Sequence, residues 1–226
     1  MDKAISTWLA SSLNIVISYI SLIFTWLSEF GVVVIAFCLT MTIYHAIKNK
    51  KLCLTFSFGL LFFGICWLLL DGAGFLPFSI KFLVKRIRPY HEIEGFVLMM
   101  DKIHYRHPSS YSFPSGHTFT AFFLATTIFI RWRKWGYVAL PLAFMVGFSR
   151  IYLGAHYFSD VLVGGILGVG VAIANFFICK LIYSRLEKKE VELINENEHY
   201  KDLIYALETY YDITEEDLEK CMKNDR

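Results

Sequence analysis

Long runs of uncharged, apolar residues constrain this chain more than any other feature of its sequence. A helix that rises about 1.5 Å per residue needs about 20 apolar residues to cross about 30 Å of hydrocarbon. The hydrophobic fraction of 56% is higher than an ordinary soluble domain carries. We therefore expect an all-α integral membrane bundle with five core transmembrane helices. These lie at about 31–47, 52–70, 118–130, 137–148 and 161–182.

Basic residues follow the first, third and fifth runs, which places them on one side of the membrane. They are Lys48, Lys50, Lys51, Arg131, Arg133, Lys134, Lys180, Arg185, Lys188 and Lys189. Since cytoplasmic loops are enriched in Lys and Arg, this side is predicted to be cytoplasmic. Residues 186–226 then form a soluble, helical cytoplasmic tail, and Thr214 with the acidic residues after it resembles a helix start. The polar loop at 75–114 lies on the opposite, extracytoplasmic side.

The N-terminal segment, residues 1–29, has two interpretations. Between residues 4 and 28 there is no charge, but polar residues recur every three or four positions and draw a stripe along one helical face. An interfacial amphipathic helix would turn that stripe to the headgroups. A sixth spanning helix would hide it against neighbouring helices. We favour the interfacial helix, followed by a catalytic membrane domain at 30–185.

Two function classes lack support in the composition. A net charge of +2 is too small to indicate nucleic-acid binding. The five cysteines stand singly, and their spacing suggests neither a metal site nor a disulfide framework. We interpret them as packing residues.

The first polar cluster is Lys81, Lys85 and Arg88, followed by Pro89. The three cations are spaced i, i+4 and i+7, so one helix would present them on one side, and Pro89 would force Arg88 out of helical geometry. Cations on a stiff element can bind an anion. Taken alone, the cluster also suits a basic loop that faces lipid headgroups.

The second cluster, Pro114-Ser115-Gly116-His117, directly precedes the third apolar run. Ser115 suits an N-cap, and Gly116 lets an anion approach the backbone. The amides and dipole of a helix start attract phosphate. His117 would stand at the edge of that anion, although a lone His at a membrane interface is commonly structural.

The third cluster lies between the fourth and fifth runs and contains Ser149, Arg150, His156 and Asp160. Charged residues in such surroundings are costly and usually functional. Arg150 offers planar donors for phosphate oxygens. On a helix, His156 and Asp160 would share a face, so Asp160 could accept the Nδ1 proton and present Nε2 as a nucleophile. The alternative is a buried ion pair that only packs helices.

In this order the three clusters resemble the signature of the type 2 phosphatidic acid phosphatase superfamily. That signature is Lys, six residues, Arg-Pro; then Pro-Ser-Gly-His; then Ser-Arg, five residues, His, three residues, Asp. Every position is matched, by Lys81, Arg88, Pro89, Pro114, Ser115, Gly116, His117, Ser149, Arg150, His156 and Asp160. The resemblance covers about residues 30–185.

The resemblance implies a role for each matched residue. His156 forms a phosphohistidine, Asp160 orients it, and His117 protonates the leaving oxygen and then helps to activate water. The implied phosphate-binding residues are Lys81, Arg88, Ser115, Gly116 and Arg150. The resemblance implies no metal and no cofactor, since cations and helix-start amides can neutralise the charge of the transition state.

The implied protein is a lipid phosphatase of a bacterial inner or plasma membrane, with its site on the extracytoplasmic side. Its partners would be the bilayer and a lipid that carries a phosphomonoester or pyrophosphate. Candidates are polyprenyl pyrophosphates such as undecaprenyl pyrophosphate, phosphatidic acid, phosphatidylglycerol phosphate and a lipid A phosphate. By analogy we favour a polyprenyl-pyrophosphate or broad lipid phosphatase. The alternatives are a vanadate-dependent haloperoxidase and a catalytically silent anion-binding membrane scaffold or transporter.

Overall fold

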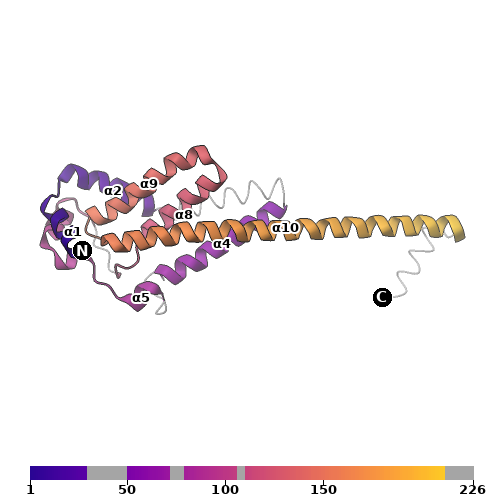
Figure 1. Cartoon of the computed structure of the whole chain (residues 1–226), viewed down its shortest axis with the longest axis horizontal. Helices are drawn as coiled ribbons and strands as arrows, with labels where there is room; N and C mark the ends of the chain where they lie inside the picture. The colour runs from indigo at the N-terminus through magenta and orange to yellow at the C-terminus, as the bar shows by residue number, and fades with distance from the viewer. Residues whose placement is uncertain (30–49, 72–78, 106–109, 212–226) are drawn as a thin grey trace. The chain divides into compact units, whose positions relative to one another are not determined.

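A computed structural model describes residues 1–29, 50–71, 79–105 and 110–211, which form helices and connecting turns with no strand among them (Figure 1). The helices are α1 (Asp2–Ser11), α2 (Ile15–Glu29), α4 (Lys50–Asp71), α5 (Ile80–Val84), α6 (Pro89–Glu92), α7 (Glu94–Lys102), α8 (Gly116–Arg131), α9 (Arg133–Tyr152) and α10 (Phe158–Tyr211). By contacts the chain divides into two compact units, Met1–Lys180 and Leu181–Arg226.

The predicted apolar runs that fall on described residues are helical, in α4, α8, α9 and α10. The run at 31–47 lies outside the described residues. Among the described helices, Phe158–Leu203 is long and apolar enough to cross a membrane, and Ile15–Trp26 and Ser57–Leu70 are shorter apolar stretches. The all-α prediction is confirmed for the described ranges, while the count of five spans stays a prediction.

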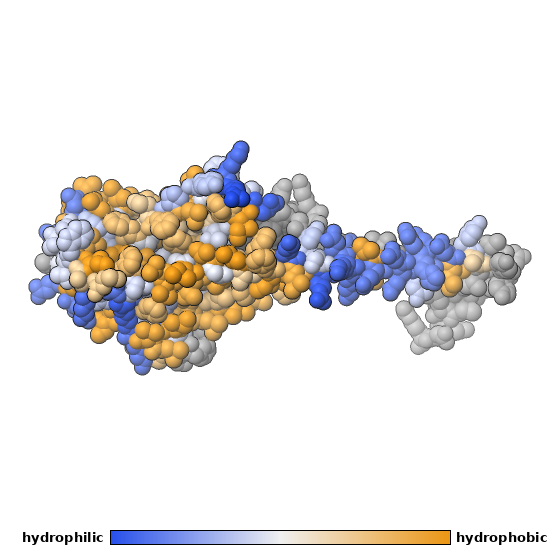
Figure 2. Space-filling view, in the orientation of Figure 1, coloured by the Kyte–Doolittle hydropathy of each residue, from blue (hydrophilic) through white to orange (hydrophobic). Residues whose placement is uncertain are grey.

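Apolar side chains dominate the visible surface of the first unit (Figure 2). Trp135, Phe144, Ile166 and Phe177 are all more than 60% exposed. Exposed apolar surface on this scale is typical of a protein that another apolar phase covers, such as lipid. In the second unit, the described part of α10 carries mainly hydrophilic residues.

Helices α8 and α9 form a tight hairpin, because α8 ends at Arg131 and α9 begins at Arg133. Gly136 allows this turn, since a Cβ there would lie 2.4 Å from the Cα of Phe129. Phe63 of α4 packs against α8, with its ring centroid 4.3 Å from that of Phe123. The hairpin brings the start of α8 and the end of α9 to the same end of the bundle.

Glycines bring α10 into backbone contact with α8. A Cβ on Gly164 would lie 2.6 Å from the carbonyl oxygen of Ser115, and one on Gly168 would lie 2.4 Å from that of Phe119. Two small residues four positions apart make one flat strip on a helix, so the helices approach more closely than larger side chains would allow. The close helix approach expected from the glycine-rich fifth run is therefore present.

The N-terminal segment forms two helices, where we expected one. They meet at the turn after Ser11, and in α2 the stripe residues Ser18, Ser21 and Thr25 are buried. Helix α2 packs against α9 and exposes apolar residues such as Ile20 and Ile23. The stripe of α2 therefore faces protein, as in the alternative that hides it against neighbours, and the preferred headgroup-facing orientation is wrong for this helix.

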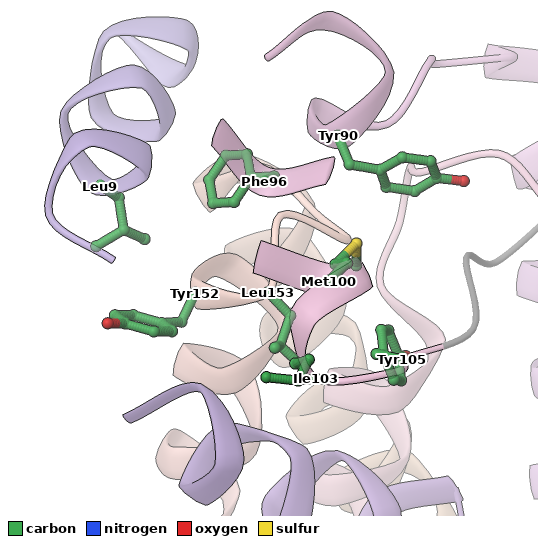
Figure 3. Packing of buried hydrophobic residues seen from close by; sticks show 8 residues of the cluster. All are labelled: Leu9, Tyr90, Phe96, Met100, Ile103, Tyr105, Tyr152 and Leu153. Carbon is green, nitrogen blue, oxygen red and sulfur yellow. The ribbon is translucent and has the colours of Figure 1, made fainter. Parts of the chain in front are cut away.

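The polar loop at 75–114 contains three short helices, α5, α6 and α7, in its described part. Apolar residues of α6, of α7 and of the turn after α7 form a buried cluster with α1 and the end of α9 (Figure 3). Its members are Leu9, Tyr90, Phe96, Met100, Ile103, Tyr105, Tyr152 and Leu153. Beside it, Gly154 has a φ of +65°, where a Cβ would lie 2.4 Å from the Phe96 ring. This cluster fixes the loop against the ends of the long helices.

The second unit begins at Leu181, and its described part is helical as far as Tyr211. Its described side chains are largely exposed. The predicted helix start at Thr214 lies outside the described residues.

Candidate active site

His156 lies in the turn between α9 and α10, and its side chain is buried. The turn is shaped by the carbonyl of Arg150, which accepts hydrogen bonds from the amides of Ala155 and His156, each at 3.1 Å. Gly154 supplies the left-handed conformation that reverses the chain. The ring of His156 is thus held by the backbone of the helix that carries Arg150.

The hydrogen bonds of His156 define its tautomer. Its Nδ1 lies 2.7 Å from the carbonyl oxygen of Ser112. Because a carbonyl only accepts, Nδ1 must carry the proton in the neutral ring. The lone pair is then on Nε2, which lies 3.2 Å from Nη1 of Arg88. A neutral imidazole in this state can act as a nucleophile through Nε2.

Asp160 does not take the Nδ1 proton directly, and this differs from our expectation. Its Oδ2 lies 3.8 Å from Nδ1 of His156, which is an ion-pair distance but too long for a hydrogen bond. The same oxygen accepts the Ser112 hydroxyl and, at 2.9 Å, the amide of Tyr157. Ser112 therefore links the two residues, with its hydroxyl on Asp160 and its carbonyl on His156.

The first cluster does not lie on one helix, as the i, i+4, i+7 spacing had predicted. Helix α5 ends at Val84, and Lys85 takes a left-handed conformation with φ 51°. Lys85 is exposed, whereas Lys81 and Arg88 are buried. Arg88 is extended before Pro89, as predicted. The chain turn at Lys85 separates one exposed cation from two buried ones.

Five hydrogen-bond contacts fix the guanidinium of Arg88. Its Nε and Nη2 donate to the carbonyl and hydroxyl of Ser110 at 2.6 and 2.9 Å, and Nη2 also reaches the carbonyl of Tyr111 at 3.1 Å. Its Nη1 donates to the carbonyl of Ala155 at 2.8 Å and faces His156. A cation held this firmly is pre-organised for an anion at Nε2 of His156.

The second cluster forms the start of α8. Ser115 is the N-cap, and its hydroxyl accepts from the amide of Thr118 at 3.4 Å. The amide of Ser115 donates to the carbonyl of Asp160 at 3.1 Å, so the start of α8 is tied to the start of α10. Gly116 and half-buried His117 form the first turn. The amides of that turn lack intrahelical acceptors, which favours an anion there.

Arg150 is buried, and two residues outside the predicted site hold it. Its Nη1 donates to Tyr105 Oη at 2.9 Å and to Thr25 Oγ1 at 3.2 Å. Its Nε has no hydrogen-bond partner among the described residues. Thr25 belongs to the polar stripe seen in the sequence, whereas Tyr105 carried no signal. The free donor leaves Arg150 able to bind an oxyanion.

The three clusters act together on the charge of His156. Burial and then the positive charges of Arg88, Arg150 and Lys81, with His117, hold the pKa of His156 well below its usual value. The ring is therefore neutral at neutral pH. The same cations favour a phosphate group beside it. The geometry thus places a neutral imidazole ring among cations that could hold an anion beside it.

The three clusters lie within a region that matches a known protein family. A model described as the PAP2 superfamily matches residues 64–183, which is more than half of the chain and includes all three clusters. The chain belongs to the PAP2 superfamily. The family resemblance expected from the three-part signature is confirmed.

Curated relatives of this PAP2 chain match it over part of their length. The "Bacitracin transport permease protein BcrC" of Bacillus licheniformis is 45% identical over 71 residues, which are 31% of this chain and 35% of the relative. The "Undecaprenyl-diphosphatase" of Sulfolobus acidocaldarius is 32% identical over 96 residues, 42% of this chain and 44% of the relative. The chain therefore spans less than half the length of these relatives.

Two solved structures share the fold of this PAP2 chain. A transmembrane PAP2 type phosphatidylglycerolphosphate phosphatase from Bacillus subtilis has a TM-score of 0.56 at 24% identity, covering 83% of this chain and 85% of that one. The LpxE protein of Aquifex aeolicus has a TM-score of 0.52 at 22% identity, covering 76% and 93%. The helical architecture is therefore that of PAP2 membrane phosphatases.

Proposed function

We propose that this protein is an integral-membrane lipid phosphatase that acts through a phosphohistidine on Nε2 of His156. One observation carries the proposal: the unprotonated Nε2 of a buried, neutral His156 lies beside the fixed guanidinium of Arg88. Relatives named as phosphatases of undecaprenyl diphosphate, lipid A and phosphatidylglycerophosphate support the reaction class.

In the first step, the Nε2 lone pair attacks phosphorus and the bond from phosphorus to the lipid oxygen breaks. Lys81, Arg88 and Arg150, with the first turn of α8 at Ser115 and Gly116, neutralise the phosphoryl oxygens in the transition state. His117 protonates the leaving oxygen, so the lipid departs as a neutral alcohol or as a lipid monophosphate. Asp160, 3.8 Å from Nδ1, stabilises the positive charge that His156 acquires.

In the second step, water attacks the phosphohistidine. His117, neutral after the first step, accepts a proton from that water as the new oxygen–phosphorus bond forms. The bond from phosphorus to Nε2 breaks, the electron pair returns to His156, and inorganic phosphate leaves. Each residue ends in its starting protonation state, and no metal or cofactor enters the balance.

The proposed substrate is a membrane lipid with a phosphomonoester or pyrophosphate head group. The exposed apolar faces of the first unit support a bilayer around it, and they would leave the lipid tail in the membrane while the head group reaches His156. We place the site on the extracytoplasmic side and the tail in the cytoplasm because of the basic turns. We also propose residues 30–185 as the catalytic membrane domain, between the N-terminal segment 1–29 and the tail 186–226.

The test is a phosphate-release panel in detergent micelles, with polyprenyl pyrophosphate, phosphatidic acid, phosphatidylglycerol phosphate and lipid A phosphate as substrates. Chelator is present throughout, so that turnover also tests metal independence. The blank is His156→Ala, which should purify normally and release no phosphate. Turnover retained in His156→Ala would show that His156 is not the nucleophile. In a separate assay, halide oxidation with added vanadate would favour a haloperoxidase instead.

A further inference from the structure

The carboxylate of Asp160 is held by an arginine that is not part of the three-part signature. Arg86 donates from Nη1 to Asp160 Oδ1 at 2.6 Å and to Ser159 Oγ at 2.6 Å. Its guanidinium also lies 4.1 Å from the ring centroid of Tyr157. Arg86 thus binds one carboxylate oxygen of Asp160, while Ser112 binds the other.

Helix α1 holds Arg86 in turn. Asp2, in the first turn of α1, accepts from Arg86 Nη2 at 2.8 Å through Oδ2. Its Oδ1 accepts from the amide of Ser159 at 3.3 Å, and its Oδ2 accepts the Ser159 hydroxyl at 2.5 Å. Asp2 therefore contacts both Arg86, which binds the Asp160 carboxylate, and Ser159, which precedes Asp160 in the chain.

Both members of the outer pair remain charged at neutral pH. Burial would raise the pKa of Asp2, but the hydrogen bonds from Arg86 and Ser159 outweigh it and the pKa is lowered. The side chain of Arg86 is 28% exposed and that of Asp2 is 22% exposed, so water screens the Asp2–Arg86 ion pair less than a pair on the open surface. When both carboxylates are ionised, they and the one guanidinium carry one net negative charge.

We propose that Asp2 and Arg86 are positioning residues, and that the Asp2–Arg86–Asp160 network keeps one net negative charge beside His156. The inference rests on the proposed function, in which His156 becomes positively charged as it takes up the phosphoryl group. Arg86 alone would neutralise Asp160 and weaken its attraction for that charge. Asp2 offsets the positive charge of Arg86.

A purely structural role for α1 is the competing explanation, and Lys3 separates the two. Lys3 fastens the same helix turn through Glu92 at 2.9 Å, with its own side chain 74% exposed. Leu9 anchors the rest of α1 in the apolar cluster. Lys3→Gln therefore removes an ion pair that docks α1 without touching Arg86 or Asp160.

The experiment compares phosphate release by the wild type, Asp2→Asn, Asp2→Glu, Arg86→Gln, Lys3→Gln and the double variant Asp2→Asn/Arg86→Gln. We expect Asp2→Asn to lower kcat about 10-fold with a smaller change in KM, since supporting partners of catalytic groups commonly have effects of this size. Asp2→Glu should restore part of the loss, and Lys3→Gln should keep the wild-type kcat. The double variant should fall short of the summed single losses.

A second readout does not depend on turnover. NMR titration of His156 should give a lower pKa in Asp2→Asn than in the wild type, because a negative charge has been removed. Lys3→Gln should not lower it. An unchanged pKa in folded Asp2→Asn would overturn the inference, as would equal kcat losses in Asp2→Asn and Lys3→Gln. A wild type that releases no phosphate from any lipid would instead refute the proposed function.

Discussion

At the scale of single residues, the site depends on the protonation state and the tautomer of His156. The Ser112 carbonyl fixes the proton of His156 on Nδ1, and burial among cations keeps the ring neutral. A nucleophilic histidine needs both conditions, because a protonated ring has no lone pair to offer. In the proposed reaction, the cations that would bind phosphate therefore also keep the attacking ring neutral.

This arrangement predicts the acidic limb of the pH profile. The reactive form of His156 is neutral, and it is lost only as pH falls through a pKa that lies below the usual value of about 6.5. The acidic limb of kcat/KM should therefore have its midpoint below pH 6.5, as measured by phosphate release on a short-chain substrate. A midpoint at or above that value would contradict the neutral, buried ring.

The same shift predicts a loss of stability in acid. The unfolded chain binds a proton at His156 below about pH 6.5, while the folded protein resists it, so the unfolded state gains protons first. The thermal midpoint in detergent should fall below pH 6.5 more steeply for the wild type than for His156→Gln. Parallel pH curves for the two proteins would argue against this.

Ser112 gives a further prediction at this scale. Ser112→Ala removes the hydroxyl bound to Asp160 but keeps the carbonyl bound to His156. Losing one hydrogen bond to a carboxylate costs about 1.5–3 kcal/mol, so kcat should fall at least about 10-fold while KM changes little. Ser110→Ala is the matched comparison, because its hydroxyl binds Arg88 and its loss should act mainly on KM.

At the scale of helices, backbone contact between α8 and α10 sets the distance between the first turn of α8 and Asp160. Gly164 and Gly168 make this contact possible, and the Ser115 amide completes it by donating to the Asp160 carbonyl. No flexible side chain stands between these elements at the two glycine contacts. The relative position of Ser115 and Asp160 should therefore vary little.

Glycine substitutions test that contact with a control in the same helix. Gly168→Ala places a Cβ 2.4 Å from a backbone oxygen and should cost about 1–3 kcal/mol through forced separation of the helices. Gly170→Ala meets nothing within 4 Å and should instead stabilise α10 by about 0.5–1 kcal/mol. Thermal midpoints in detergent measure both changes. A tolerated Gly168→Ala would mean that the helices are not in close contact.

The helices and the motif residues could be predicted from the sequence, whereas the residues that hold the motif residues in place could not. Charged residues between apolar runs are costly, so Arg150, His156 and Asp160 stood out. The break of the N-terminal segment into α1 and α2 lacks a proline or glycine to mark it. Ser112 was also invisible, because it acts partly through its carbonyl and any residue type supplies one. Arg86 and Asp2 meet only through the tertiary fold.

At the scale of the whole chain, every residue proposed for the reaction lies in the first unit, Met1–Lys180. The second unit adds no described side chain to the site, and its described part is hydrophilic and largely exposed. We expect a chain that ends after Arg185 to insert and to keep the wild-type kcat. Phosphate release per purified protein checks this, and a large loss of kcat in a folded truncation would assign the tail a role in turnover.

In the proposed reaction, the hydrogen bond from His156 Nδ1 to the Ser112 carbonyl would also decide which isomer of phosphohistidine forms. Imidazole can be phosphorylated on either nitrogen, giving the tele isomer at Nε2 or the pros isomer at Nδ1. With Nδ1 committed to a carbonyl, phosphorus can be accepted only on the far side of the ring. The trapped intermediate should therefore be tele-phosphohistidine alone. Because phosphohistidine is stable in alkali, ³¹P NMR of the protein denatured in alkali can distinguish this isomer from its pros counterpart.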